Sequence, residues 1–142
     1  MRSEELRILR LEIPREFLEE MLERAGSAAP AEACGILAGA EDRVERLYKM
    51  TNVAERCDRY MMKPQEQFAV VKDIRAAGLK MLAIYHSHPA MPAWPSAEDI
   101  RLALTKDMAY VIVSLEDPDR PVVRGFNIDD RAITEVAIEF GE

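Results

Sequence analysis

Both histidines of this 142-residue chain lie in one short stretch, HSHPAMPAWPSAED, which runs from His86 to Asp99. On a β-strand, alternate side chains share one face and lie roughly 6.6 Å apart along the backbone. His86 and His88 can therefore direct two imidazoles at one point, while Ser87 faces away. Because imidazole nitrogen is a common ligand of zinc, the stretch predicts a bound metal ion.

Asp99 is the third ligand that this stretch offers. Prolines restrict the loop after the histidines, and Ser96 is a good N-cap, which would place Asp99 in the first turn of a helix. A catalytic zinc is held by three protein ligands and keeps its fourth position for water. Taken alone, Ser96 and Asp99 could be a capping box that only opens a helix. The joint pattern, in a chain with no other histidine, favours a zinc site made of His86, His88 and Asp99.

Glu32 is the candidate general base. Hydrolysis at a metal needs a group that takes a proton from water and passes it to the leaving group. Glu32 is the only charged residue from Ala25 to Ala40. Among such small apolar neighbours a carboxylate is either exposed at a sheet edge or kept there for a functional role. Cys34, two residues later, could instead be a nucleophile paired with a histidine. A cysteine in a small apolar strand is more often plain packing.

The elements that must position these residues follow from hydrophobic periodicity. Apolar runs predict strands over 9–13, 33–40, 43–50, 81–88, 109–115, 121–128 and 132–140, and a short further strand at 60–62. Helical spacing predicts helices over 14–26, 64–78 and 96–105, the second with Phe68, Val71 and Ile74 facing inward. Helices that interrupt strands predict one α/β domain over residues 1–142, of mixed α+β type, with helices packed on a mixed sheet.

The composition argues against several other classes of protein. The chain has 19 basic and 26 acidic residues, and its basic residues are scattered, which argues against binding of nucleic acid. Its first residues, MRSEELRILRLEIP, mix charges with apolar side chains and predict neither a signal peptide nor a membrane span. We therefore expect a cytoplasmic protein in which Cys34 and Cys57 are free thiols. Whether it forms a homodimer stays open.

The histidine stretch resembles the signature of the JAMM metalloproteases, also called the MPN-plus or Mov34 family. That signature has two histidines separated by one residue, then a serine and an aspartate, with a glutamate on an upstream strand. His86, His88, Ser96, Asp99 and Glu32 match all five positions. The resemblance implies a curved mixed sheet flanked by helices, similar to the fold of the cytidine deaminases.

The resemblance extends beyond the five residues and implies an activity. The order of elements over residues 9–113 is similar, and EACGILAG with RYMMKPQEQ looks like the compact, stand-alone bacterial members. Members of the family cleave amide or isopeptide bonds at the C-terminal glycine of ubiquitin-like proteins, or release an amino acid from a small sulfur-carrier protein. The implied function is a zinc-dependent hydrolase whose partner is the tail of such a protein.

The resemblance also implies a role for each matched residue. His86, His88 and Asp99 would hold zinc. Glu32 would take a proton from the zinc-activated water and hand it to the departing amine, and Ser96 would hydrogen-bond the tetrahedral oxyanion.

Some alternatives remain beside this interpretation. The family contains non-catalytic members that serve as scaffolds or dimerisation modules, although these have typically lost metal ligands. A zinc deaminase would carry HxE and PCxxC, and neither string occurs in the chain. At 142 residues the chain has little room for the insertions with which relatives specific for ubiquitin chains grip two ubiquitins. Trp94, in the motif loop, either packs on the core or lines a groove for the substrate tail.

Overall fold

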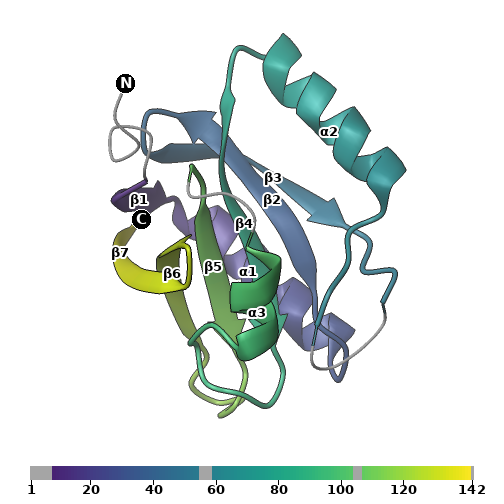
Figure 1. Ribbon diagram of the computed structural model, residues 1–142, viewed down its shortest axis with the longest axis vertical. Coiled ribbons are helices and arrows are strands. Elements are labelled where there is room, and N and C mark those ends of the chain that lie inside the picture. Colours follow the sequence, from purple (N-terminus) through teal and green to yellow (C-terminus); the bar gives the residue numbers. More distant parts are fainter. Residues whose placement is uncertain (1–7, 55–58, 104–106, 142) are drawn as a thin grey trace.

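A mixed sheet forms the centre of the molecule, which the computed structural model describes for residues 8–54, 59–103 and 107–141 (Figure 1). In chain order the elements are β1 (Arg10–Ile13), α1 (Arg15–Ala28), β2 (Cys34–Ala40), β3 (Arg43–Met50), α2 (Pro64–Ala76), β4 (Lys80–His88), α3 (Ala97–Leu102), β5 (Ala109–Ser114), β6 (Val122–Asp129) and β7 (Ala132–Phe140). The predicted mixed α+β class is confirmed.

The described strands form one sheet whose order, β1-β3-β2-β4-β5-β6-β7, closes on itself. β1 pairs in parallel with β7 and meets β3 at a single pair, Glu12 with Arg43. β2 and β3 form an antiparallel hairpin. β4, which carries both histidines, lies between β2 and β5. Because hydrogen bonds fix β4 on both sides, it is a rigid platform for side chains that must hold one geometry.

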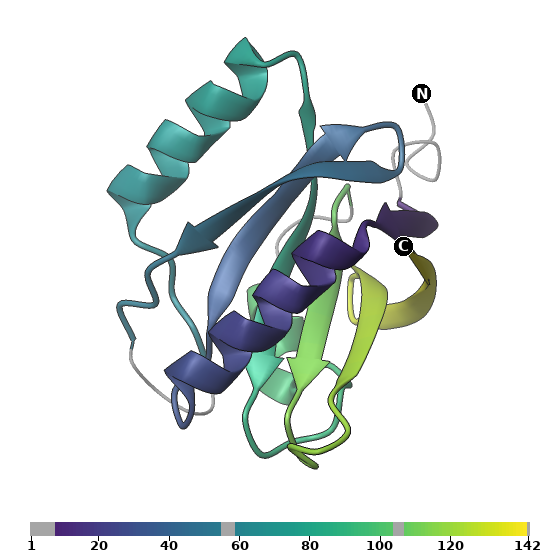
Figure 2. The same ribbon diagram turned by 180° about the vertical axis from the view of Figure 1, so that it is seen from behind.

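The helices divide between the two faces of the sheet (Figures 1 and 2). α1 covers one face, where Met21 belongs to the same apolar cluster as Leu37. α2 covers the other face, where Ile74 clusters with Ile36. α3 adds Ile100 to a third cluster around β5 and β6. Each face of the sheet therefore has its own core.

Both histidines of β4 point to the face that α2 and α3 cover. Tyr85 belongs to the cluster under α1, and Ile84 packs against the clusters under α2 and α3. Since side chains alternate along a strand, His86 and His88 share the face of Ile84. The sheet thus presents its two imidazoles toward α3.

The ends of the longer helices differ slightly from those predicted. α1 runs to Ala28, beyond Gly26, while α2 stops at Ala76. Gly78 then adopts a φ of +72°, which glycine takes without strain and which ends the helix. No helix in the described part of the chain is long and apolar enough to cross a membrane.

The prediction that Phe68 faces inward is wrong, because its side chain is 68% exposed. Val70 and Ile74 make the inward stripe of α2. A step of two residues turns about 200° around a helix, so Phe68 points away from the sheet. The ammonium of Lys72 lies 5.2 Å from the centroid of its ring.

The segment between β3 and α2 forms a short ribbon in place of the strand expected at 60–62. Asn52 and Met62 make one isolated bridge. The Val53 N–H donates to the Met61 carbonyl at 2.8 Å, and the Met61 N–H donates to Asn52 Oδ1 at 2.9 Å. The ribbon, residues 52–54 and 59–62, is therefore fixed by its own hydrogen bonds, outside the sheet.

Candidate metal centre

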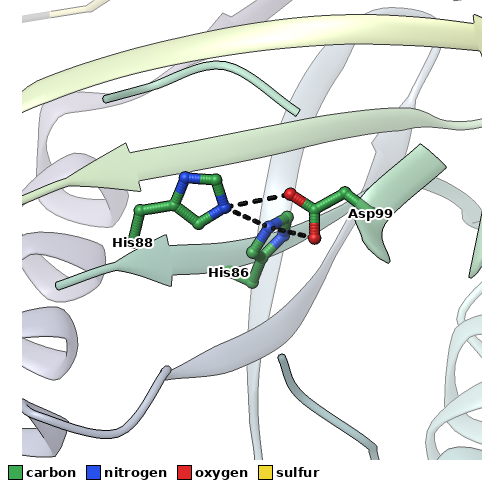
Figure 3. A group of neighbouring side chains, drawn as sticks. All are labelled: His86, His88 and Asp99. Carbon is green, nitrogen blue, oxygen red and sulfur yellow. Dashed lines mark hydrogen bonds and ion pairs between the residues drawn. The ribbon is translucent and has the colours of Figure 1, made fainter. Parts of the chain in front are cut away.

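Three side chains that could bind a metal converge at the end of β4 (Figure 3). Nε2 of His86 lies 3.3 Å from Nε2 of His88. Oδ1 of Asp99 lies 3.2 Å from His86 Nε2, and its Oδ2 lies 2.9 Å from His88 Nε2. All three residues are buried. The structure thus brings together the three ligands that the sequence suggested.

Asp99 reaches the histidines because α3 begins beside the end of β4. The Asp99 N–H donates to Ser96 Oγ at 3.0 Å, and the Ser96 N–H donates to Asp99 Oδ2 at 2.9 Å, which is a complete capping box. The two interpretations of these residues are therefore compatible. The same carboxylate caps the helix and faces both imidazoles.

Hydrogen bonds also hold the loop between β4 and α3. Nδ1 of His88 lies 2.9 Å from the Pro92 carbonyl, and Ser114 Oγ donates to the Met91 carbonyl at 2.6 Å. A carbonyl only accepts, so Nδ1 of His88 carries a proton, and Nε2 is the nitrogen that faces Asp99 and binds a metal once its own proton is lost. Such a contact fixes the tautomer that a metal requires.

The charges of the site depend on one another. Burial alone would raise the pKa of Asp99, but hydrogen bonds from both imidazoles and from the Ser96 N–H hold it well below its usual range. Burial lowers the pKa of His88, but its contacts with Asp99 and the Pro92 carbonyl outweigh burial and leave it raised. Asp99 is therefore an anion at neutral pH, as a ligand for a cation should be.

The three groups fit zinc in type and in spacing. Imidazole nitrogen and carboxylate oxygen both bind zinc at about 2.0–2.2 Å, and tetrahedral bonds of that length place the ligand atoms about 3.3 Å apart. The separations observed here are 3.3, 3.2 and 2.9 Å. Three protein ligands leave one tetrahedral position for water or substrate, which is the arrangement of a catalytic site.

Glu32 lies just before β2 and is only 1% exposed. The sequence left an exposed edge glutamate open as the alternative, and this burial excludes it. The Asn52 Nδ2 group donates to the Glu32 carbonyl at 2.9 Å. The negative charge of Glu32 also contributes to the raised pKa of His88, so its carboxylate acts on the same site.

Two residues that support Glu32 were missed by the sequence analysis. Ser87 faces away from the metal site as expected, but its Oγ accepts the Ala33 N–H at 2.7 Å, and its N–H donates to the Ala33 carbonyl at 3.0 Å. Asn52 is the second residue, through its bond to the Glu32 carbonyl. No local signal marks either one, because these partners are 54 and 20 positions apart in the chain.

The buried environment of Cys34 argues against a nucleophilic thiolate. Cys34 is a free, buried cysteine whose Sγ lies 3.9 Å from the Met50 carbonyl. Burial raises its pKa to about 12, so the thiolate is scarce at neutral pH. The packing role considered from sequence agrees with this position. Cys57 lies outside the described residues.

Trp94 packs on the core and stays partly exposed. Its ring meets that of Phe126 edge to face at 5.0 Å, and the Arg124 guanidinium lies 5.5 Å from its centroid. Its side chain is 46% exposed. The packing role is therefore observed.

Comparison with known proteins places this geometry among metallopeptidases. Residues 14–128 match a family model described as prokaryotic homologs of the JAB domain. The CysO-cysteine peptidase of Mycobacterium tuberculosis is 39% identical over 134 residues, which cover 93% of this chain and 92% of that protein. The desampylase of Haloferax volcanii is 34% identical over 127 residues, which cover 87% of this chain and 89% of that protein.

A solved structure extends the likeness to the metal site. It is described as JAMM, a metalloprotease-like zinc site in the proteasome and signalosome. The two chains superpose with a TM-score of 0.60 at 26% identity, over 94% of this chain and 99% of that one. The buried group of His86, His88 and Asp99 resembles such a zinc site.

Proposed function

This chain belongs to the prokaryotic JAB family of JAMM/MPN domains, and we propose that it is a zinc-dependent hydrolase of carrier-protein adducts. It would cleave the amide or isopeptide bond at the C-terminal glycine of a ubiquitin-like or sulfur-carrier protein. The observation that carries the proposal is the buried convergence of His86, His88 and Asp99. Glu32 is near enough for its charge to help raise the pKa of His88.

The ligands are proposed to be Nε2 of both histidines and the Asp99 carboxylate. Zinc bound there would polarise the scissile carbonyl and lower the pKa of water toward neutrality. The chain's own contribution is to keep these donors in one geometry. The Pro92 carbonyl sets the tautomer of His88, and the Ser96 N–H holds Asp99 Oδ2.

Glu32 and Ser96 would carry the proton transfer and the oxyanion contact. The Glu32 carboxylate accepts a proton from the attacking water and then delivers it to the leaving amine. Ser96 Oγ already accepts the Asp99 N–H, so its own proton is free to be donated to the substrate oxyanion. The Asp99 N–H holds Ser96 Oγ in place, which reduces the reorganisation needed during the reaction.

We propose cysteine, or another small amine, as the preferred leaving group. The 39% identical relative is named a CysO-cysteine peptidase, and it matches over nearly the whole of both chains. The desampylase is the less similar relative. Removal of a protein modifier is therefore the second activity to test.

The substrate tail would bind extended along the ribbon beside the site. The sheet closes on itself, so its described strands offer no edge to a further strand. In the ribbon, the backbone groups of Met61 face Asn52 and Val53. In an extended segment the backbone N–H and C=O groups of successive residues point to opposite sides. Those of Tyr60 and Met62 therefore point away from Asn52 and Val53, where the backbone of a substrate tail could hydrogen-bond to them.

Two measurements test the proposal. First, the purified chain should bind one zinc ion and lose activity when a chelator removes it. A scaffold or dimerisation module needs no zinc and would show neither property.

Second, one ubiquitin-fold sulfur carrier is prepared with cysteine, or with the side-chain amine of lysine, attached to its C-terminal glycine. We expect release of cysteine to be faster when both products are followed by mass spectrometry. Faster cleavage of the lysine adduct would reverse the preference, and cleavage of neither would refute the function.

A further inference from the structure

The two histidines of the site are oriented in different ways. Nδ1 of His88 contacts the Pro92 carbonyl at 2.9 Å, which is the usual support of a metal-binding imidazole. Within the described residues, Nδ1 of His86 is buried and has no hydrogen-bond partner. The Tyr60 ring instead stacks on His86, with ring centroids 4.7 Å apart and planes inclined by 27°.

We propose that Tyr60 is a positioning residue that orients His86 for the metal through the face of its ring. The inference rests on the proposed function, since it needs a metal at His86, but it assigns a role that the metal-binding motif does not contain. A stacked aromatic ring resists rotation of the imidazole about its bond to Cβ. That rotation would carry Nε2 away from Asp99 Oδ1, which lies 3.2 Å away.

The ribbon can hold Tyr60 in this place because it is anchored on both sides of the ring. On one side, Met61 bonds to Asn52 Oδ1 at 2.9 Å, and Asn52 in turn bonds to the Glu32 carbonyl at 2.9 Å. On the other side, the Arg59 guanidinium lies 3.7 Å from the Glu98 carboxylate of α3. The segment that carries Tyr60 therefore contacts both the residue proposed as base and the helix that supplies Asp99.

His86 is confined from a second direction by His88. The two imidazoles meet edge to face, with centroids 5.1 Å apart and planes inclined by 62°. Tyr60 and His88 thus restrict the His86 ring by contact, whereas His88 itself is restricted by a hydrogen bond. The contribution of Tyr60 comes from its ring, so phenylalanine should replace it and an aliphatic side chain should not.

The test measures metal binding by the full chain with Tyr60 changed to leucine or to phenylalanine. Zinc affinity is obtained by competition with a coloured chelator, and the visible spectrum of the cobalt-loaded protein reports the geometry of the ligands. We expect Tyr60→Leu to weaken zinc binding about 10- to 100-fold, as loss of a residue that supports a ligand typically does, and to shift the cobalt bands. Tyr60→Phe should stay within about twofold of wild type. Met61→Leu, at an exposed position of the same ribbon, is the matched control.

Two results would overturn the inference. Zinc binding as tight in Tyr60→Leu as in wild type would show that the ring does not orient His86. An equal loss in Tyr60→Phe would assign the effect to the hydroxyl. If Tyr60→Leu does not fold, Tyr60→Met replaces the ring by a flexible apolar side chain, and zinc binding as tight as in wild type would again overturn the inference. Failure of wild type to bind zinc would refute the proposed function itself, so the two failures can be told apart.

Discussion

The two ends of β4 differ in what they bury. At its beginning, Leu82 and Ala83 are fully buried in the apolar cluster under α1. At its end, His86, Ser87 and His88 are equally buried, each only 1% exposed. Buried polar groups cost free energy unless they are paired, and here each has a contact with a residue of another segment. One strand thus supplies stability at its beginning and a polar site at its end.

This difference predicts that activity and stability can be separated by substitution. Changes at the polar end of β4, or at Glu32 and Ser96, which are proposed to act with it, should remove hydrolysis with modest effects on the free energy of unfolding. The groups lost there are proposed to take part in the reaction and contribute little apolar packing. Changes at the apolar end should destabilise the fold and leave the chemistry of folded molecules nearly intact. The predictions below test this separation.

Glu32→Gln should have the largest effect, a loss of about 10²- to 10⁴-fold in kcat, because an amide cannot accept the proton of the attacking water. Zinc should remain bound, as measured by metal analysis of the purified protein. The free energy of unfolding should stay the same or rise, since a neutral amide is cheaper to bury than a carboxylate. Glu45→Gln, at an exposed position of β3, is the matched control. Undiminished hydrolysis in Glu32→Gln would disprove its assignment as the base.

Ser96→Ala should lower kcat by about 10²- to 10³-fold, the usual effect of removing one oxyanion donor. It also removes the cap of α3, which should cost about 1 kcal/mol of unfolding free energy. Kinetics and denaturant unfolding of the same variant separate the two losses. Ser114→Ala, which loses a bond to the neighbouring loop, should show the stability loss with a far smaller kinetic change. Equal kinetic losses in both variants would mean that Ser96 acts only through the loop.

Leu82→Ala tests the apolar end of β4. The fully buried leucine should leave a cavity, and the free energy of unfolding should fall by about 2–5 kcal/mol. Below the unfolding transition, kcat of the zinc-loaded enzyme should stay within a few-fold of wild type. A kinetic loss as large as that of Ser96→Ala would break the proposed separation, because it would show that the two ends of the strand are coupled.

Ser87→Ala should have an intermediate effect on both properties, since Ser87 lies at the polar end but faces the other side of the sheet. Without its Oγ, the Ala33 N–H is left without that acceptor, which should cost about 1–3 kcal/mol of unfolding free energy. Glu32 directly precedes Ala33, so the base should be slightly misplaced and kcat should fall about tenfold. Normal kcat with reduced stability would mean that Ser87 supports the fold alone.

The sequence predicted those parts of the site whose geometry is local. His86 and His88 follow from the alternation of one strand, and Ser96 with Asp99 follows from one helix start. Ser87, Asn52 and Tyr60 were missed because their partners come from distant segments, which residue spacing does not reveal. Phe68 was misplaced for a related reason: helical spacing groups apolar residues on a helix, but the packing of α2 on the sheet, through Val70 and Ile74, decides which of them are covered.

Substitution of Cys34 should have the smallest effect on kcat. Cys34 tests whether an apolar residue close to the polar end of β4 takes part in the reaction. Cys34 of β2 lies opposite His86 of β4 in the sheet, yet its side chain packs in the apolar cluster under α2. With a pKa of about 12, only about one molecule in 10⁴ carries the thiolate at pH 8. In a Cys57→Ser background, a thiol reagent at pH 8 should therefore label Cys34 far more slowly in the folded protein than in denaturant. Cys34→Ala should keep kcat within about twofold, whereas a loss comparable to that of Glu32→Gln would restore the cysteine as a nucleophile.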